Sequence, residues 1–506
     1  MLLMGIDIGT TNTKVGLFQE DGTSIATASA PTVTYRDPEG FSYYDPHQMW
    51  EMIAMAIREV MQKAGAGFES SQPSEIRVGA IGITSMAESG LLVSRQTGEP
   101  RSIFMPWFDN CSQPQADWIA QEADLFERFC VAGVHSSFKL GLPKLMWLKE
   151  RDPSAFEGSV WLSASGYIAY RLTGAMAFDY SLAARTFAFD IESKTWDEAW
   201  IKSCGLDPSV FPDAYPAGTP LGMITSDLAQ SLGLTGDVPV CIAGHDHVVS
   251  SLSVGAIFPG IVYDSMGTAE TLVGTLENKK LGRREFESGL SYGCHVANDS
   301  MFWMGGNSGS GASVEWLRIL LGDPQLAYTE VLALLAEVKQ GPSGILYFPY
   351  ISGSGAPHVD ASARAAFIGL SKSHGKGDLI KAVLEGTAYQ LQIIREETEH
   401  ISGRKFTKLV VVGGGTRNAH WLQIKADVLN CSLQIPPIEE ASLLGAALCA
   451  GIGAGIYASA EAAVSATANL TTTHVEPDQS RHTDYRRLYE LGYVALQAPL
   501  RAFYRR

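Results

Sequence analysis

Residues 7–14 read Asp7-Ile8-Gly9-Thr10-Thr11-Asn12-Thr13-Lys14 and lie between two apolar stretches, 2–6 and 15–18. A second segment, 260–274, repeats this layout around Gly267-Thr268. Each copy predicts a strand, a Gly-Thr turn and a returning strand, and glycine there permits positive φ and close approach of a ligand to the backbone. Although the acid precedes the glycine by two residues in one copy and three in the other, a duplicated domain is the simplest interpretation, with domains at 1–250 and 251–506.

Strands and helices alternate within each half. Short apolar runs that end in glycine or a polar residue predict strands at 78–84 and 238–244, and residues 408–415 predict a strand that runs into a glycine turn. Helices are expected at 247–254, at 313–321, over roughly fifteen residues from Ala419, and within 442–460, where a turn follows. This alternation predicts an α/β fold whose ligands gather at the carboxyl ends of the strands.

Composition and charge exclude several classes of protein. The chain has 506 residues, 46% hydrophobic and 18% charged, with a net charge of −16. A field of that sign repels nucleic acid and anionic membranes, so neither is an expected partner. Seven scattered cysteines without a C-x-x-C pair, and an amino terminus without a basic leader, predict reduced thiols and a cytoplasmic location.

The turn at 7–14 offers what a phosphate group requires. It supplies backbone N–H groups, small hydroxyl side chains and one cation, Lys14, and the carboxylate of Asp7 is a suitable oxygen ligand for Mg²⁺ through water. Alternatively, the threonines cap their own hairpin and Lys14 is solvated. The second Gly-Thr turn favours phosphate binding.

Two further glycine clusters precede helices, at 305–311 and at 413–415. Neither is specific by itself, because a tight strand-to-helix turn needs no ligand. Together with two Gly-Thr turns, they indicate room for a flat ring or a ribose beside the backbone.

Asp246 is the candidate catalytic base. It follows a predicted strand and begins a predicted helix, where the positive helix end should keep a carboxylate ionised. Phosphoryl transfer asks its base only to orient a hydroxyl and accept the proton late. The alternative is that Asp246 merely caps the helix. The neighbouring His245 and His247 do not make a metal site, since no third spaced ligand is present.

Two loops are candidates for binding the acceptor. Residues 84–90 follow a strand and contain Glu88, and residues 107–110 combine an aromatic face with polar tips, which suits a sugar. Considered singly, each is better explained as a surface loop or a partly buried tryptophan.

Together these segments resemble the FGGY family of carbohydrate kinases, from Gly5 to about Gly453. The most specific part is similar to the C-terminal signature of that family and comprises 344–350, 355–357, 363–370 and 382–386. Residues 413–415 with 426–429, and 440–447, are also similar to the family.

This resemblance implies two actin-like (ribonuclease H-like) domains with ATP and sugar in a cleft that closes on binding. It implies that Asp246 is the base, that Asp7 meets Mg²⁺, and that the acceptor contacts Ala87, Glu88, Trp107, Asp109, Asp246 and His247. Phosphates would meet Thr10, Thr11, Asn12, Lys14, Gly267 and Thr268, and the rest of the nucleotide would meet Gly311, Glu315, Gly414 and Asn418. The implied cofactors are ATP and Mg²⁺, the partner is a small sugar or polyol, and a homodimer or other homo-oligomer is expected.

Departures from relatives affect the identity of the acceptor. Ala87 stands where glycerol kinases have an arginine, and His247 where they have a glutamine. Xylulokinases typically show Met-His where this chain has Met86-Ala87, and residues near Ser354-Gly355 replace the usual Glu-Arg of the family. We therefore expect a small ketose or polyol, with pentuloses such as xylulose ahead of glycerol.

Two other classes stay open. An actin-type or heat-shock-type ATPase would share the Gly-Thr turns without needing Asp246 or Trp107, and a sugar-responsive regulator would have lost turnover. Release of ADP that depends on sugar separates the kinase from both.

Overall fold

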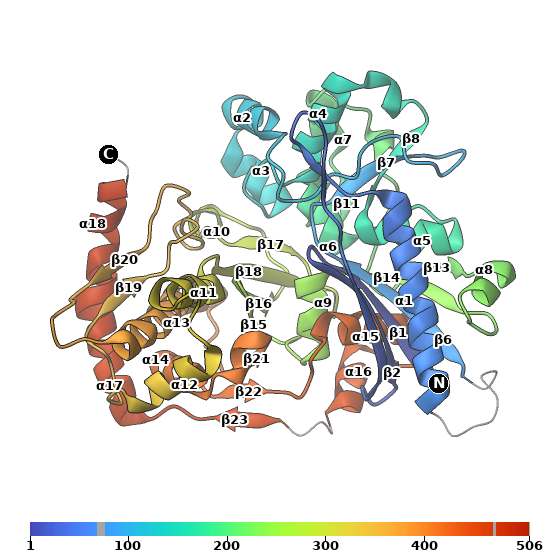
Figure 1. Ribbon diagram of the computed structural model, residues 1–506. Coiled ribbons are helices and arrows are strands. Elements are labelled where there is room, and N and C mark those ends of the chain that lie inside the picture. The colour runs from blue at the N-terminus through green and yellow to red at the C-terminus, as the bar shows by residue number, and fades with distance from the viewer. Residues whose placement is uncertain (68–75, 469–471, 505–506) are drawn as a thin grey trace.

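The computed structural model describes residues 1–67, 76–468 and 472–504, and Figure 1 shows two lobes, each built around its own sheet. This confirms the predicted α/β fold with two actin-like halves. None of the helices in these ranges is long and apolar enough to cross a membrane.

The first sheet has six strands in the order β13-β14-β6-β1-β2-β3. A hairpin joins β1 to β2, and their register places Asp7 opposite Lys14. Strands β6 and β14 then add in parallel, so the carboxyl ends of β1, β6 and β14 lie at one edge. The strands are β1 (Leu2–Ile8), β2 (Asn12–Gln19), β3 (Ser24–Pro31), β6 (Val78–Ser85), β13 (Pro220–Met223) and β14 (Pro239–His245).

The second sheet repeats this plan in seven strands, in the order β17-β18-β16-β15-β21-β22-β23. Its hairpin β15–β16 pairs antiparallel, and β21 and β22 add in parallel beyond β15. The strands are β15 (Ile261–Met266), β16 (Glu270–Leu276), β17 (Ser291–Cys294), β18 (Met301–Asn307), β21 (Lys408–Val412), β22 (Leu433–Ile435) and β23 (Thr473–Val475).

Helices cover both sheets. In α1 (Pro46–Gly67), Ile53, Ile57 and Val60 recur at helical spacing and are fully buried against β2 and β3. The other helices are α2 (Gln113–Glu122), α3 (Leu125–Ala132), α4 (Gly141–Arg151), α5 (Ala164–Thr173), α6 (Tyr180–Ala183), α7 (Glu198–Ser203), α8 (Ser226–Ser231), α9 (Asp246–Ser253), α10 (Arg283–Glu287), α11 (Ser310–Leu321), α12 (Tyr328–Glu337), α13 (Lys376–Ser402), α14 (Ala419–Leu429), α15 (Ala441–Gly453), α16 (Ala460–Thr467), α17 (Gln479–Leu488) and α18 (Ala495–Tyr504).

Short elements fill the connections. They are β4 (Tyr35–Arg36), β5 (Ser42–Tyr43), β7 (Gly90–Ser94), β8 (Ser159–Ser163), β9 (Phe178–Asp179), β10 (Phe189–Asp190), β11 (Thr195–Trp196), β12 (Ala214–Tyr215), β19 (Leu346–Phe348) and β20 (Ala366–Ile368). With them come η2 (Pro153–Phe156), η3 (Ala184–Thr186), η4 (Pro208–Val210), η5 (Gly414–Arg417) and the π-helical η6 (Tyr489–Val494).

Several predicted boundaries were wrong by a few residues. Helix α9 begins one residue before the prediction, α11 begins at Ser310 rather than Ser313, and α14 spans 11 residues rather than about fifteen. The prediction of a strand that runs into a glycine turn over 408–415 is confirmed: β21 ends at Val412, and Gly413 adopts a φ of 97° that a strand does not permit. The helix and turn predicted within 442–460 are confirmed, because α15 ends at Gly453 and turn residues follow it before α16 begins at Ala460.

Helix α15 packs on the sheet of the other half. It lies against β1, β6, β14 and α9, as Figure 1 shows for the red helix beside the blue strands. Glycines in the strands permit this approach, because a Cβ on Gly5 would lie 2.0 Å from the carbonyl oxygen of Leu443, and one on Gly82 would lie 1.8 Å from that of Ala446. A boundary drawn at residue 250 therefore separates the two sheets. It assigns α15 to the C-terminal half, although this helix covers the sheet of the N-terminal half.

Candidate active site

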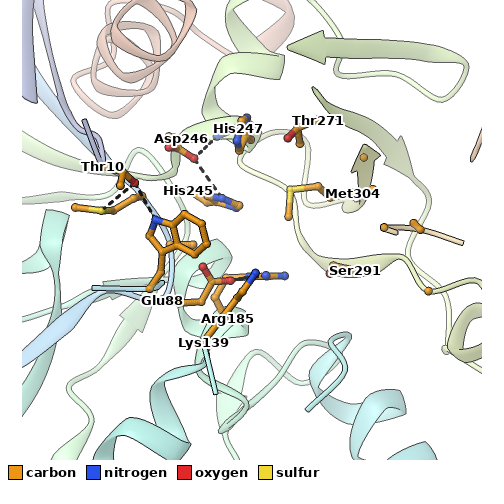
Figure 2. A pocket seen from close by; sticks show the side chains of 18 residues that line it. Thr10, Glu88, Lys139, Arg185, His245, Asp246, His247, Thr271, Ser291 and Met304 are labelled. Carbon is orange, nitrogen blue, oxygen red and sulfur yellow. Dashed lines mark hydrogen bonds and ion pairs between the residues drawn. The ribbon is translucent and has the colours of Figure 1, made fainter. Parts of the chain in front are cut away.

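A cleft of about 440 Å³ lies between the two halves. Its first wall carries Thr10, Glu88 and Asp246, and its second wall carries Thr271 and Met304 from the other sheet (Figure 2). Residues at strand ends and in the loops that follow them line much of the first wall, which is where ligands of α/β folds bind, whereas Thr271 and Met304 of the second wall lie within strands β16 and β18.

Asp246 lies at the first position of α9, directly after β14. Its Oδ1 accepts a hydrogen bond from the backbone N–H of its neighbour His247 at 2.7 Å and lies 3.2 Å from Nε2 of His245. The capping position belongs to His245, so Asp246 is not the helix cap. Within the described residues, its Oδ2 has no protein partner and is free to accept a proton.

The electrostatic expectation for Asp246 needs a correction. The helix terminus alone does not keep this carboxylate ionised, because burial raises the pKa of Asp246 to about 7, and the backbone hydrogen bond from His247 only partly opposes that shift. Burial likewise holds the pKa of His245 well below its usual value, so that ring is neutral. The site therefore contains a carboxyl group that titrates near neutrality.

Asp7, near the carboxyl end of β1, lies close enough to Asp246 to interact with it electrostatically, but it does not line the cleft. Its Oδ2 accepts a hydrogen bond from Ser442 at 2.6 Å, and its buried Oδ1 has no partner within the described ranges. Burial, and next the Asp246 carboxylate, raise the pKa of Asp7 to about 7. Two neighbouring carboxyl groups that disfavour each other's ionisation form a natural position for a cation.

The phosphate turn is less open than the sequence suggested. Lys14 is not free, because its Nζ donates to Glu440 at 2.6 Å, although its side chain stays 29% exposed. Thr10 lines the cleft and accepts a hydrogen bond from Nε1 of Trp107 at 2.8 Å. Thr11 is exposed at the tip, and Asn12 begins β2, where its carbonyl closes the turn on Gly9.

Glu88 is held in a left-handed conformation, with φ at 57°. Its carboxylate accepts a hydrogen bond from Nε of Arg185 at 2.7 Å and a second from NH2 of the same residue. Its carbonyl accepts from Nζ of Lys144 at 2.6 Å, and Lys144 is fully buried in α4. Sequence reasoning missed Arg185 and Lys144, since no local motif marks either of them.

The remaining acceptor candidates have different surroundings. Ala87, Trp107 and His247 line the cleft, and Nζ of Lys139 lies 5.0 Å from the centre of the Trp107 ring. Asp109 does not line it, because its carboxylate is turned toward the backbone and accepts from the N–H groups of Ser42 at 2.6 Å and Cys111 at 2.9 Å. Asp109 therefore fixes the loop that carries Trp107.

The expected nucleotide segments meet behind the cleft. The N–H of Gly311 in α11 donates to the carbonyl of Gly267 at 3.2 Å, and Ala312 donates to Thr268 at 2.9 Å. A Cβ on Gly311 would lie 2.4 Å from Gly267 O, so this glycine allows the helix to rest on the turn. A Cβ on Gly414 would meet no atom within 4 Å, which leaves open space at that turn.

Two other nucleotide candidates have protein partners. Asn418 is buried and caps α14 by accepting from the N–H of Trp421 at 3.1 Å. Glu315 is exposed on α11 and pairs with Arg318 at 2.7 Å. Neither lines the cleft.

A buried ion-pair network ties these segments together. Lys425 of α14, fully buried, donates to Oδ2 of Asp264 at 2.6 Å and to Glu270, and Ser310 of α11 donates to the other oxygen of Glu270 at 2.7 Å. Asp264 and Glu270 flank the Gly267–Thr268 turn on β15 and β16. One lysine therefore connects the turn, α11 and the helix that follows η5.

Family models describe both halves of this chain. The N-terminal domain of the FGGY family of carbohydrate kinases matches residues 2–253, and its C-terminal domain matches residues 262–454. The chain belongs to the FGGY family of carbohydrate kinases. It is a phosphotransferase that acts on a carbohydrate hydroxyl, and its cofactors are ATP and Mg²⁺.

This FGGY kinase is similar to relatives with different names. A xylulose kinase of Staphylococcus epidermidis is 28% identical over 97% of this chain and 95% of its own length. A glycerol kinase of Gloeobacter violaceus is also 28% identical, over 90% and 88%. The solved structure of a xylulose kinase from Rhodospirillum rubrum covers all of both chains with a TM-score of 0.89 and 28% identity.

The residues of this FGGY kinase fit the Mg²⁺ that its family uses. Asp7 offers a buried carboxylate oxygen without a partner in the described chain. The charge of Asp246 lies close enough to raise the pKa of Asp7. Bound there, Mg²⁺ supplies positive charge that screens the phosphate oxygens. Among the described residues no group of three or more His, Cys, Asp or Glu side chains could hold a metal ion. A Mg²⁺ ion held by Asp7 would thus depend on water and phosphate for its other ligands.

Proposed function

We propose that this FGGY kinase transfers the terminal phosphoryl group of ATP to a hydroxyl of a ketopentose, with xylulose as the first candidate, and that Asp246 is the catalytic base. The observation that carries the proposal is that Oδ2 of Asp246 has no partner among the described residues and lies in a cleft that also contains Glu88 and Trp107. Two of the similar proteins are named xylulose kinases. In addition, this chain has Ala87 at the position where glycerol kinases have an arginine.

The mechanism assigns each side chain one task. The ring of Trp107 contacts the apolar face of the sugar, and Glu88 accepts a hydrogen bond from a sugar hydroxyl. Asp246, ionised, orients the attacking hydroxyl through Oδ2 and receives its proton as the bond to phosphorus forms. Because burial raises the pKa of Asp246 to about 7, turnover should increase as pH rises through that region.

The other assignments form part of the same proposal. Thr10, Thr11, Asn12, Lys14, Gly267 and Thr268 would meet phosphate, and Gly311, Gly414, Glu315 and Asn418 would lie near the rest of ATP. Lys14 would exchange Glu440 for phosphate when the nucleotide binds. The division at residue 250, a homo-oligomer and a cytoplasmic location stay predictions, and the seven free cysteines are consistent with the last.

A panel of acceptors tests the proposal. Production of ADP is coupled to an optical readout with xylulose, ribulose, xylitol, glycerol and a pentonate, each with and without Mg²⁺. A pentulose should give the largest kcat/KM. Turnover on glycerol alone would refute the choice of acceptor, and ADP production that no sugar stimulates would instead favour an ATPase of the actin or heat-shock type.

A further inference from the structure

Glu88 is fixed from three directions before any ligand binds. Its backbone adopts the left-handed region, which a residue other than glycine occupies only where its surroundings enforce it. Lys144 holds its carbonyl at 2.6 Å, and Arg185 holds its carboxylate. The carboxylate therefore points in one direction, with little freedom left to lose when a sugar arrives.

Arg185 comes to Glu88 from a distant part of the chain. It lies in η3, 97 residues later in the sequence, and its guanidinium lines the same cleft. The side chain of Ala87 has no donor, and the side-chain donors to the Glu88 carboxylate come from Arg185. Figure 2 shows the Arg185 and Glu88 side chains side by side.

One nitrogen of this guanidinium is unused. Nε and NH2 of Arg185 both bind Glu88, whereas NH1 is shielded from solvent and has no hydrogen-bond partner in the described part of the chain. A buried donor without an acceptor costs free energy, and a guanidinium can only donate. An oxygen from a ligand in the cleft would satisfy it.

We infer that Arg185 determines acceptor specificity: paired with Glu88, it donates a hydrogen bond to an oxygen of a neutral sugar while Glu88 accepts one from a neighbouring hydroxyl. This inference rests on the proposed function of the cleft. Such a pair recognises a hydroxyketone or a vicinal diol, which offers an acceptor and a donor on adjacent carbons. It deepens the proposal by assigning a residue that no motif marked.

The charge of the pair excludes a sugar acid as the preferred acceptor. The carboxylate of Glu88 neutralises Arg185 at contact distance, with both side chains about nine-tenths buried. Asp246 adds a second carboxyl group to the same cleft. Lys139 is the cation that remains near Trp107. A carboxylate on the acceptor would therefore meet more repulsion than attraction.

A structural ion pair would account for fewer of these observations. Buried ion pairs contribute little net stability, because desolvation offsets their attraction. Arg128 and Asp197 supply the matched comparison, since they form a 2.7 Å pair with both side chains about one-fifth exposed and do not line the cleft. If Arg185 were merely structural, its replacement should resemble that of Arg128.

The test measures KM for the acceptor and for ATP separately, together with thermal unfolding, in the wild type and in Arg185→Met, Arg185→Lys, Glu88→Gln and Arg128→Met. We expect Arg185→Met to raise the KM of the best pentulose about 10- to 100-fold, as loss of a charged hydrogen bond does, while the KM of ATP changes less than about threefold. Arg185→Lys should recover only part of this, because an ammonium lacks the forked geometry.

Glu88→Gln adds an independent readout. It leaves Arg185 with an uncompensated charge, so use of a pentonate relative to the pentulose should rise at least about tenfold. A structural role would not move this ratio. Arg128→Met should lower the unfolding temperature and leave both KM values unchanged.

Three possible failures are distinguishable. A wild type that phosphorylates no neutral sugar would overturn the proposed function. An active wild type would overturn the role of Arg185 alone if Arg185→Met and Arg185→Lys, both folded, kept the acceptor KM within about threefold of the parent value. A wild type that prefers the pentonate would overturn the choice of a neutral acceptor.

Discussion

Replacing Asp246 with asparagine should abolish the proton acceptor and stabilise the folded protein. The amide keeps the shape of the carboxylate and can still accept from the N–H of His247, but it cannot take a proton from a sugar hydroxyl. Removal of a general base typically slows the chemical step by about 10²- to 10⁴-fold. ATP affinity should not change, because Asp246 lies outside the glycine turns.

The effect on stability follows from the pKa of Asp246. Burial raises it from 3.8 to about 7, so the folded state binds this proton more tightly than the unfolded state. The wild type therefore loses stability as pH rises from about 4 to about 7, to a limit of about 4 kcal/mol at 1.36 kcal/mol per pKa unit. An asparagine does not titrate. The difference in unfolding free energy between Asp246→Asn and the wild type should therefore grow by at most about 2 kcal/mol between about pH 5.5 and pH 7.5. For a domain of this size, that corresponds to about 4–8 °C in unfolding temperature.

The assay is thermal unfolding of both proteins across that pH range, with single-turnover phosphorylation of the best acceptor on the same samples. Asp152→Asn is the control, because Asp152 is an exposed cap whose replacement should leave the rate and the pH trend unchanged. An Asp246→Asn variant that turns over within about threefold of the parent would refute the catalytic role. A difference in unfolding temperature that stays constant with pH would refute the raised pKa.

Three further residues around the site, none of which lines the cleft, can be tested by substitution. Gly414→Val should leave unfolding unchanged, since its Cβ meets open space, and weaken ATP binding at least about tenfold by calorimetry; normal affinity would remove this turn from the nucleotide site. Lys425→Met leaves Asp264 and Glu270 without a cation and should cost about 3–5 kcal/mol in chemical unfolding, part of which Glu270→Gln should restore; an unchanged midpoint would contradict the network. Lys144→Met should raise the acceptor KM about 3- to 10-fold and not that of ATP, because the carbonyl of Glu88 loses its partner. Because burial lowers the pKa of Lys144 to about 7, the free energy of unfolding of the wild type should rise relative to that of Lys144→Met as pH increases from about 7 to 10. A difference in unfolding free energy that does not change with pH would contradict this prediction.

Local patterns predicted the parts of the fold that local chemistry determines. Both Gly-Thr hairpins, the strand before Asp246 and the turn at 413–415 were predicted from sequence and are present. Helix starts were less accurate, because the first turn of a helix depends on packing that the sequence does not display. Ser310, for example, begins α11 while bonding Glu270, which is 40 residues away in the sequence.

The composition of the site was harder to predict. Arg185 and Lys144 reach Glu88 across 97 and 56 residues, so no window of sequence contains the cluster. Lys14 belongs to a motif that favours phosphate binding, but its partner in the structure, Glu440, lies 426 residues away in the sequence. Desolvation also escaped sequence reasoning, because the burial that raises the pKa of Asp246 comes from the closed packing of two sheets and cannot be inferred from the helix start alone.

The position of α15 has a consequence for how the protein is made. As the ribosome releases the chain, the first sheet emerges early, but the helix that covers β1, β6 and β14 is synthesised about 200 residues later. Until then the backbone grooves at Gly5 and Gly82, and the apolar side chains around them, have no cover. The amino-terminal half should therefore depend on chaperones during synthesis and aggregate when produced as a separate fragment, whereas a fragment supplied with residues 441–467 in trans should remain dispersed.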